Sequence, residues 1–144
     1  MESEIKLLGG KVIKRTLPSI HGPSGTDAPA LKRLILPQGE LAQFYDDDLG
    51  IRYMAMIDLL PEKPRGNHYH KVKQEYIYVL EGEVELITEE IGNQERASIL
   101  LKKGDLVVIE VLIAHVLRPV TAGRAIEFSP ARFDVADIQR YPLI

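Results

Sequence analysis

The stretch that decides the fold reads Gly66-Asn-His68-Tyr-His70-Lys-Val-Lys-Gln-Glu75-Tyr-Ile-Tyr-Val-Leu-Glu-Gly82. His68 and His70 are two residues apart, and on a β-strand this spacing places both imidazoles on the same face. Glu75 follows at the start of a run of aromatic and β-branched residues, which predicts a second strand. Two imidazoles side by side on one wall are a natural half of a metal site. The stretch therefore predicts two neighbouring strands that carry residues of the metal-ligand type.

Short β-like runs with turn signals between them lie on both sides of this stretch. Glu81-Gly82 predicts a tight hairpin turn between two of the expected strands. No segment between residues 30 and 130 has a helical period, and only residues 133–140 predict a short helix. The pattern indicates an all-β sandwich or barrel, since closing a sheet removes its exposed edges. The expected strands cover residues 31–36, 41–45, 51–60, 76–80, 84–88, 97–101, 106–109, 115–120 and 124–128.

The chain has 144 residues, which suits one domain with a sizeable core. Residues 18–29 are rich in Pro, Gly and Ser and predict an arm or loop before the barrel. We therefore expect three parts, in which an N-terminal arm and a C-terminal tail with a possible short helix flank the barrel. These parts cover residues 1–30, 31–130 and 131–144.

The bulk composition narrows the class of partner. A formal net charge of −3 leaves no basic excess to neutralise phosphates, which argues against nucleic acid as a partner. The chain contains no cysteine, so disulfides and thiolate metal sites are excluded and a reducing cytoplasm is expected. No apolar run has the length of a bilayer span or of a signal peptide, so no membrane partner is expected.

The order of ligand-type residues resembles the cupin superfamily. The first cupin motif has the form His-x-His, three or four residues, Glu, six residues, Gly, and every position is matched between His68 and Gly82. Gly104 and His115 match the second motif in register, although its Pro, Gly and Asn are replaced. The resemblance implies a jelly-roll barrel, also called a double-stranded β-helix. It also implies a metal set of His68, His70, Glu75 and His115.

Such a ligand set suits one divalent transition metal per chain. Three neutral imidazoles and one carboxylate accept Fe, Mn, Ni, Co or Zn, and the order of affinities does not choose among them. An octahedral ion would keep two positions for water or for a bidentate substrate, and it would act as a Lewis acid or activate water.

A narrower resemblance links Arg65-Gly-Asn-His68-Tyr to the RmlC-like, sugar-nucleotide branch of the cupins. That branch includes 3,5-epimerases and ketoisomerases that act on dTDP-keto-sugars. The resemblance implies that Arg65 contacts the substrate and that His68 is a catalytic base, since an imidazole abstracts a proton next to a ketone near neutral pH. One imidazole nitrogen cannot be base and ligand at once. The additional residues His70, Glu75 and His115 exceed what the base mechanism needs and favour the metal.

These resemblances predict a homodimeric enzyme that acts on a small-molecule substrate in carbohydrate or sugar-nucleotide metabolism, of the isomerase or epimerase type. Two alternatives stay open, a metal-dependent dioxygenase or other oxidoreductase and a non-catalytic cupin that binds a small molecule. His21 is expected to lie outside the site, and Arg118 and Glu127 are expected at the surface or an interface. Tyr76 and Tyr78 alternate with Glu75 and should face away from the metal.

Overall fold

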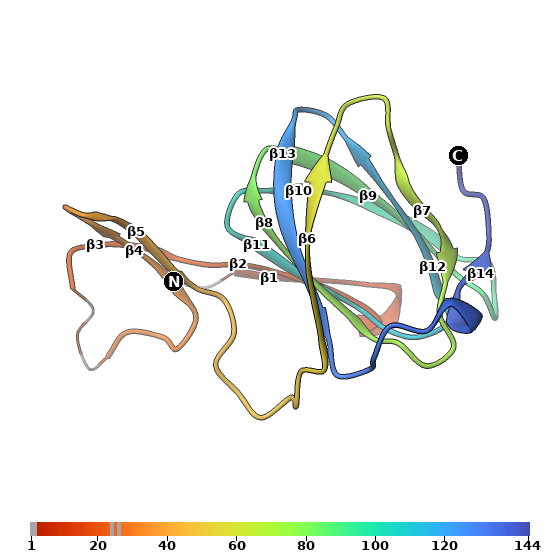
Figure 1. The fold of residues 1–144 in the computed structure, drawn as a ribbon, viewed down its shortest axis with the longest axis horizontal. Coiled ribbons are helices and arrows are strands. Elements are labelled where there is room, and N and C mark those ends of the chain that lie inside the picture. Colours follow the sequence, from red (N-terminus) through yellow and green to blue (C-terminus); the bar gives the residue numbers. More distant parts are fainter. Residues whose placement is uncertain (1–2, 24, 26) are drawn as a thin grey trace.

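The computed structural model describes residues 3–23, 25 and 27–144, and this part of the chain is built mainly of strands in three sheets (Figure 1). Two 3-10 helices, η1 (Leu8–Gly10) and η2 (Val135–Asp137), complete the elements. The strands are β1 (Ser3–Leu7), β2 (Val12–Thr16), β3 (Ser19–His21), β4 (Lys32–Leu36), β5 (Gly39–Gln43), β6 (Tyr53–Leu59), β7 (Arg65–Tyr69), β8 (Glu75–Glu81), β9 (Glu83–Glu90), β10 (Arg96–Lys102), β11 (Asp105–Ile109), β12 (Ile113–Pro119), β13 (Gly123–Ser129) and β14 (Gln139–Arg140).

Two of the sheets make the barrel. A six-stranded sheet has the order β1-β2-β11-β8-β13-β6, and a five-stranded sheet has the order β10-β9-β12-β7-β14. Their facing side chains form one buried cluster, to which Ile77 and Val107 come from the first sheet and Leu86 and Leu101 from the second. This confirms the prediction of an all-β barrel. Within the described residues, no helix has the length and apolar character needed to cross a membrane.

Alternation along β8 sends its side chains to two different sides of the six-stranded sheet. Ile77 and Val79 enter the core between the sheets. Tyr78 is buried on the other face, where it stacks on Phe44 with ring centroids 4.3 Å apart. Tyr76 packs on the same side as Tyr78, so both tyrosines face away from the barrel interior, as expected.

The N-terminal part differs from the predicted division of the chain. β1 and β2 already belong to the six-stranded sheet, where β2 pairs with β11. β3, β4 and β5 form a separate sheet that projects from the barrel, on the left of Figure 1, so the arm reaches Gln43. β2 carries Lys14 and Arg15 beside its apolar residues, which hides the alternation that marks a half-buried strand. Residues 1, 2, 24 and 26 of the predicted arm lie outside the described residues.

Two local predictions also change. Glu81-Gly82 makes a corner rather than a hairpin, because β8 and β9 belong to different sheets. Gly82 has φ +88°, and a Cβ there would lie 2.8 Å from the carbonyl oxygen of Ala122, so the corner requires glycine. The predicted helix over residues 133–140 is reduced to η2, after which the chain becomes extended at Ile138 and β14 pairs with β7.

Candidate metal centre

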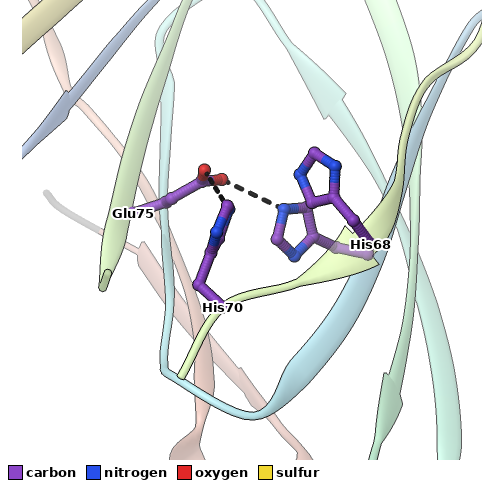
Figure 2. A group of neighbouring side chains, drawn as sticks. His68, His70 and Glu75 are labelled. Carbon is purple, nitrogen blue, oxygen red and sulfur yellow. Dashed lines mark hydrogen bonds and ion pairs between the residues drawn. The ribbon is translucent and has the colours of Figure 1, made fainter. Parts of the chain in front are cut away.

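The two sheets bring the four predicted ligands together. His68 lies on β7 directly opposite His115 on β12, and His70 follows one residue after the end of β7. Glu75 is the first residue of β8, on the other sheet. Figure 2 shows its carboxylate reaching across toward the imidazole of His70. The candidate site therefore lies inside the barrel, between the sheets.

Distances within this group are short. Glu75 Oε1 lies 2.9 Å from His70 Nε2, and Glu75 Oε2 lies 3.1 Å from His115 Nε2. The His68 ring centroid is 4.8 Å from those of both other histidines. One ligand atom from each of the four residues fits within 4.8 Å of all the others. His70, Glu75 and His115 are buried, whereas His68 is half-buried.

Two backbone carbonyls determine the tautomers of the buried histidines. His70 Nδ1 lies 2.9 Å from the carbonyl oxygen of Asp137, and His115 Nδ1 lies 3.0 Å from that of Ile113. A carbonyl only accepts, so each Nδ1 carries a hydrogen and donates it. In each neutral ring the Nε2 lone pair then points at the Glu75 carboxylate.

The Nε2 lone pairs of His70 and His115 and the oxygens of Glu75 are all electron-rich and repel one another. A cation between them is therefore needed. His115 Nε2 is buried and makes no hydrogen bond to any described residue. Protons on the imidazoles can supply the positive charge, and so can a metal ion. Backbone carbonyls that fix the remote nitrogen of a ligand histidine are typical of metal sites. The residues present therefore fit a divalent metal.

Charges in the group support the same conclusion. Burial raises the pKa of Glu75, but His115, His70 and Lys73 together lower it well below its usual value. Burial lowers the pKa of His115, but the Glu75 carboxylate, the Ile113 carbonyl and Glu127 together raise it further, so its pKa is raised overall. Burial and the neighbouring histidines lower the pKa of His68 to about 4. At neutral pH Glu75 is thus ionised and His68 is neutral.

A cavity of about 200 Å³ opens beside the four residues. His68, Glu75 and His115 line it from the barrel interior, and Arg65 and Gly66 line it as well. Arg65 is exposed and donates from Nε to the carbonyl oxygen of Asp58 at 2.8 Å. Two larger hollows, of about 490 and 450 Å³, lie where the projecting sheet meets the barrel, and neither is lined by a metal-ligand candidate. Because the reactive groups gather in the smaller cavity, we take it as the site.

Residues 55–128, about half of the chain, match the sequence model of the cupin domain. The chain belongs to the cupin family. No curated protein matches this cupin, whereas many solved structures do.

The similar solved structures include two epimerases and a ketoisomerase. A dTDP-4-dehydrorhamnose 3,5-epimerase from Sulfolobus tokodaii has a TM-score of 0.74 at 13% identity, covering 97% of this cupin and 81% of that chain. The RmlC epimerase from Mycobacterium tuberculosis has a TM-score of 0.73 at 12% identity, covering 94% and 71%. The WlaRB TDP-quinovose 3,4-ketoisomerase from Campylobacter jejuni has a TM-score of 0.68 at 18% identity, covering 77% and 88%. At these identities the likeness establishes a shared fold.

The cupin barrel also contains a buried lysine that the sequence did not single out. Lys73 Nζ lies 3.2 Å from Glu75 Oε1 and 3.2 Å from Glu127 Oε1, and 4.4 Å from the centre of the Tyr53 ring. Burial lowers the pKa of Lys73, but the two carboxylates raise it above its usual value. Lys73 therefore stays charged and offsets the negative charge of both carboxylates.

Glu127 is the clearest correction among the site residues of this cupin. We expected it at the surface or an interface, but it lines the cavity together with Tyr53. Alternation along β13 could have predicted this position. Ala125, Glu127 and Ser129 alternate with Ile126 and Phe128, which face away from the barrel interior. Arg118, by contrast, is exposed and pairs with Glu85, as expected.

Two further predictions concern His21 and Arg65. His21 lies on β3 in the projecting sheet, outside the candidate site. Arg65 lines the cavity beside His68.

Metal affinity is expected to rise with pH between about pH 6.5 and 8, the range above the ordinary histidine pKa. The pKa of His115 is raised, so a metal must displace its proton until the pH exceeds that pKa. His68, with a pKa of about 4, is already neutral throughout this range. Each displaced proton steepens the dependence by about tenfold per pH unit. Chelator competition at several pH values measures it, and a flat profile over this range would contradict the assignment of His115 as a ligand.

Proposed function

We propose that this cupin is a metal-binding enzyme that isomerises or epimerises keto-sugar nucleotides. The observation that carries the proposal is the three-histidine, one-carboxylate cluster beside a cavity lined by Arg65. The fold gives support, because the similar structures named above are epimerases and a ketoisomerase of dTDP- or TDP-linked sugars. The acidic composition without cysteine agrees with a cytoplasmic setting.

In this proposal His68, His70, Glu75 and His115 hold one divalent ion. The ion, which would be Fe, Mn, Ni, Co or Zn, would act as a Lewis acid on a substrate oxygen. We assign His68 as a ligand rather than a free base. A pKa of about 4 leaves its lone pair available but makes it a weak base at neutral pH.

Proton transfer is then assigned to the opposite wall of the cavity. Glu127 offers a carboxylate that would take the proton from the carbon next to the ketone and leave an enolate. Tyr53 keeps its own proton at neutral pH, because burial and the Glu127 carboxylate raise its pKa. Return of a proton to the other face of the same carbon would give the epimer. Return to the former carbonyl carbon, with the proton of the neighbouring hydroxyl passing to the former ketone oxygen, would give the isomer. Arg65 would bind the diphosphate, since a guanidinium pairs well with phosphate oxygens.

A homodimer is part of the proposal. β5 lies at the edge of the projecting sheet, and an open strand edge is a template for pairing with another chain. Leu41 on β5 and Met54 and Met56 on β6 are exposed apolar side chains. Sedimentation analysis is expected to give the mass of two chains, and the mass of one chain at working concentration would contradict this part.

Hydrogen exchange from solvent tests the proposed reaction. In D₂O, the purified protein is expected to replace the hydrogens next to the ketone of dTDP-4-keto-L-rhamnose with deuterium, as seen by proton NMR. The Glu127→Gln variant should lose exchange by at least about 100-fold, since a positioned general base contributes about that much. The His21→Ala variant, changed outside the site, should keep the rate of the unaltered chain.

Other outcomes point to the alternatives. If no keto-sugar nucleotide exchanges hydrogen, the isomerase proposal is wrong. Oxygen uptake by the iron-loaded protein without hydrogen exchange would support the dioxygenase alternative. Tight binding of a sugar nucleotide without exchange or oxygen uptake would support a non-catalytic binding cupin.

A further inference from the structure

The turn η2 near the C-terminus lies against the loop that joins two of the candidate ligands. The Asp137 carboxylate accepts hydrogen bonds from the backbone N–H groups of Lys71 at 2.8 Å, Val72 at 3.2 Å and Lys73 at 3.0 Å. The carbonyl oxygen of the same residue accepts the Nδ1–H of His70 at 2.9 Å. One residue of η2 therefore makes four contacts with the segment from His70 to Lys73.

These contacts determine two features of the site. Hydrogen bonds from three consecutive N–H groups to one carboxylate are charge-assisted, and they fix the path of the chain between His70 and Glu75. The bond to Nδ1 holds the His70 ring so that its Nε2 faces Glu75, which is the nitrogen that would bind a metal. Because Lys73 lies in this loop and its N–H is one of the three donors, its ammonium group is placed by the same contacts.

The chain beyond Asp137 is fastened to the strand that carries His68. Arg140 on β14 pairs with His68 on β7. Asn67 accepts from Tyr141 N at 2.7 Å through its backbone and from Leu143 N at 2.8 Å through its side chain. Leu143 is buried in an apolar cluster on the outer side of the five-stranded sheet. Residues 137–144 thus contact the strand at His68 and the imidazole ring of His70.

We propose that residues 137–144 are a structural part of the metal centre and that Asp137 is the positioning residue for His70. The consequence for metal affinity rests on the metal site proposed above, whereas the orientation of His70 does not. Loss of the Asp137 carboxylate releases three N–H groups and lets the loop and the His70 ring move. Metal affinity then falls by about 10–100-fold, the range seen when partners of ligand side chains are removed.

The test compares Asp137→Ala with the matched control Asp134→Ala. Asp134 also accepts a backbone hydrogen bond within η2, from Ala136 N at 3.0 Å, but no hydrogen bond links its side chain to residues 70–73. Co²⁺ affinity is measured by chelator competition, and the visible spectrum of the Co²⁺ protein reports the ligand geometry. Nitrogen NMR of the metal-free protein reports which nitrogen of His70 carries the hydrogen.

We expect Asp137→Ala to lose about 10–100-fold in Co²⁺ affinity. The same variant should change the Co²⁺ spectrum and lose the Nδ1–H form of His70. Asp134→Ala should leave the affinity, the spectrum and the tautomer unchanged. If Asp137→Ala does not fold, Asp137→Asn replaces it, since the amide keeps one oxygen acceptor for the three N–H groups. An affinity, spectrum and tautomer unchanged in the Asp137 variant would overturn the proposal, and so would equal losses in both variants. If the unaltered protein binds no Co²⁺, the proposed metal function fails, and the His70 tautomer still decides the positioning role.

Discussion

Replacing Glu75 with Gln is expected to abolish metal binding and to destabilise the metal-free protein by about 3–5 kcal/mol, the usual cost of breaking a buried ion pair. The Glu75 carboxylate lies within 3.2 Å of polar nitrogens on His70, Lys73 and His115, and its residue is 3% exposed. An amide keeps the shape of the side chain but removes the charge that these groups require. Lys73 would then keep Glu127 as its remaining carboxylate partner among the described residues.

Metal content after equilibration with metal measures the first effect, and urea unfolding in the presence of a chelator measures the second. Glu85→Gln is a matched control, because Glu85 pairs with Arg118 at the surface. That change should alter stability by no more than about 1 kcal/mol and leave metal content unaltered. An unchanged metal content in Glu75→Gln would remove this residue from the ligand set.

Gly66→Ala is expected to cost about 3 kcal/mol or more of stability and to weaken metal binding, through steric overlap and backbone strain. Gly66 has φ +114°, and a Cβ there would lie 2.6 Å from the carbonyl oxygen of His115 and 3.1 Å from the Cα of Val116. At this place the register between β7 and β12 shifts. The two strands would have to separate, and His68 would move away from His115.

Thermal unfolding with and without chelator measures the effect of this change. Gly92→Ala serves as the control, since no heavy atom lies within 4 Å of a Cβ built at Gly92. If Gly66→Ala does not fold while Gly92→Ala does, the loss of stability at Gly66 is larger than expected and has the same cause. A Gly66→Ala protein with the stability and metal affinity of the original chain would show that β7 and β12 need no such close approach.

The sequence predicted the parts of the site that depend on local spacing. The first motif named His68, His70 and Glu75 as ligands, and the structure brings them within one cluster. His115 followed from its register in the second motif, and it lies opposite His68. The expected strands between residues 76 and 128 also recur, because alternating apolar residues there face one closed core.

Features that depend on distant contacts were not predictable in the same way. Lys73 lies beside Lys71 and Gln74 in sequence and looks like part of a solvated surface, yet its partner Glu127 arrives from β13. Asp137 lies more than sixty residues from the backbone N–H groups that donate hydrogen bonds to it, and no local sequence pattern links them. Gly82 has the composition of a hairpin turn, but only the assignment of β8 and β9 to different sheets shows a corner. Such pairings are set by the fold as a whole.

The most direct test of the central claim is the transition-metal content of the protein purified without added metal. Elemental analysis is expected to find about one equivalent of a single divalent metal per chain, or tight uptake of one equivalent on addition. The Glu75→Gln protein, prepared in parallel, should hold almost none. Less than about 0.2 equivalents of any transition metal, with no tight uptake, would contradict a metal centre at His68, His70, Glu75 and His115.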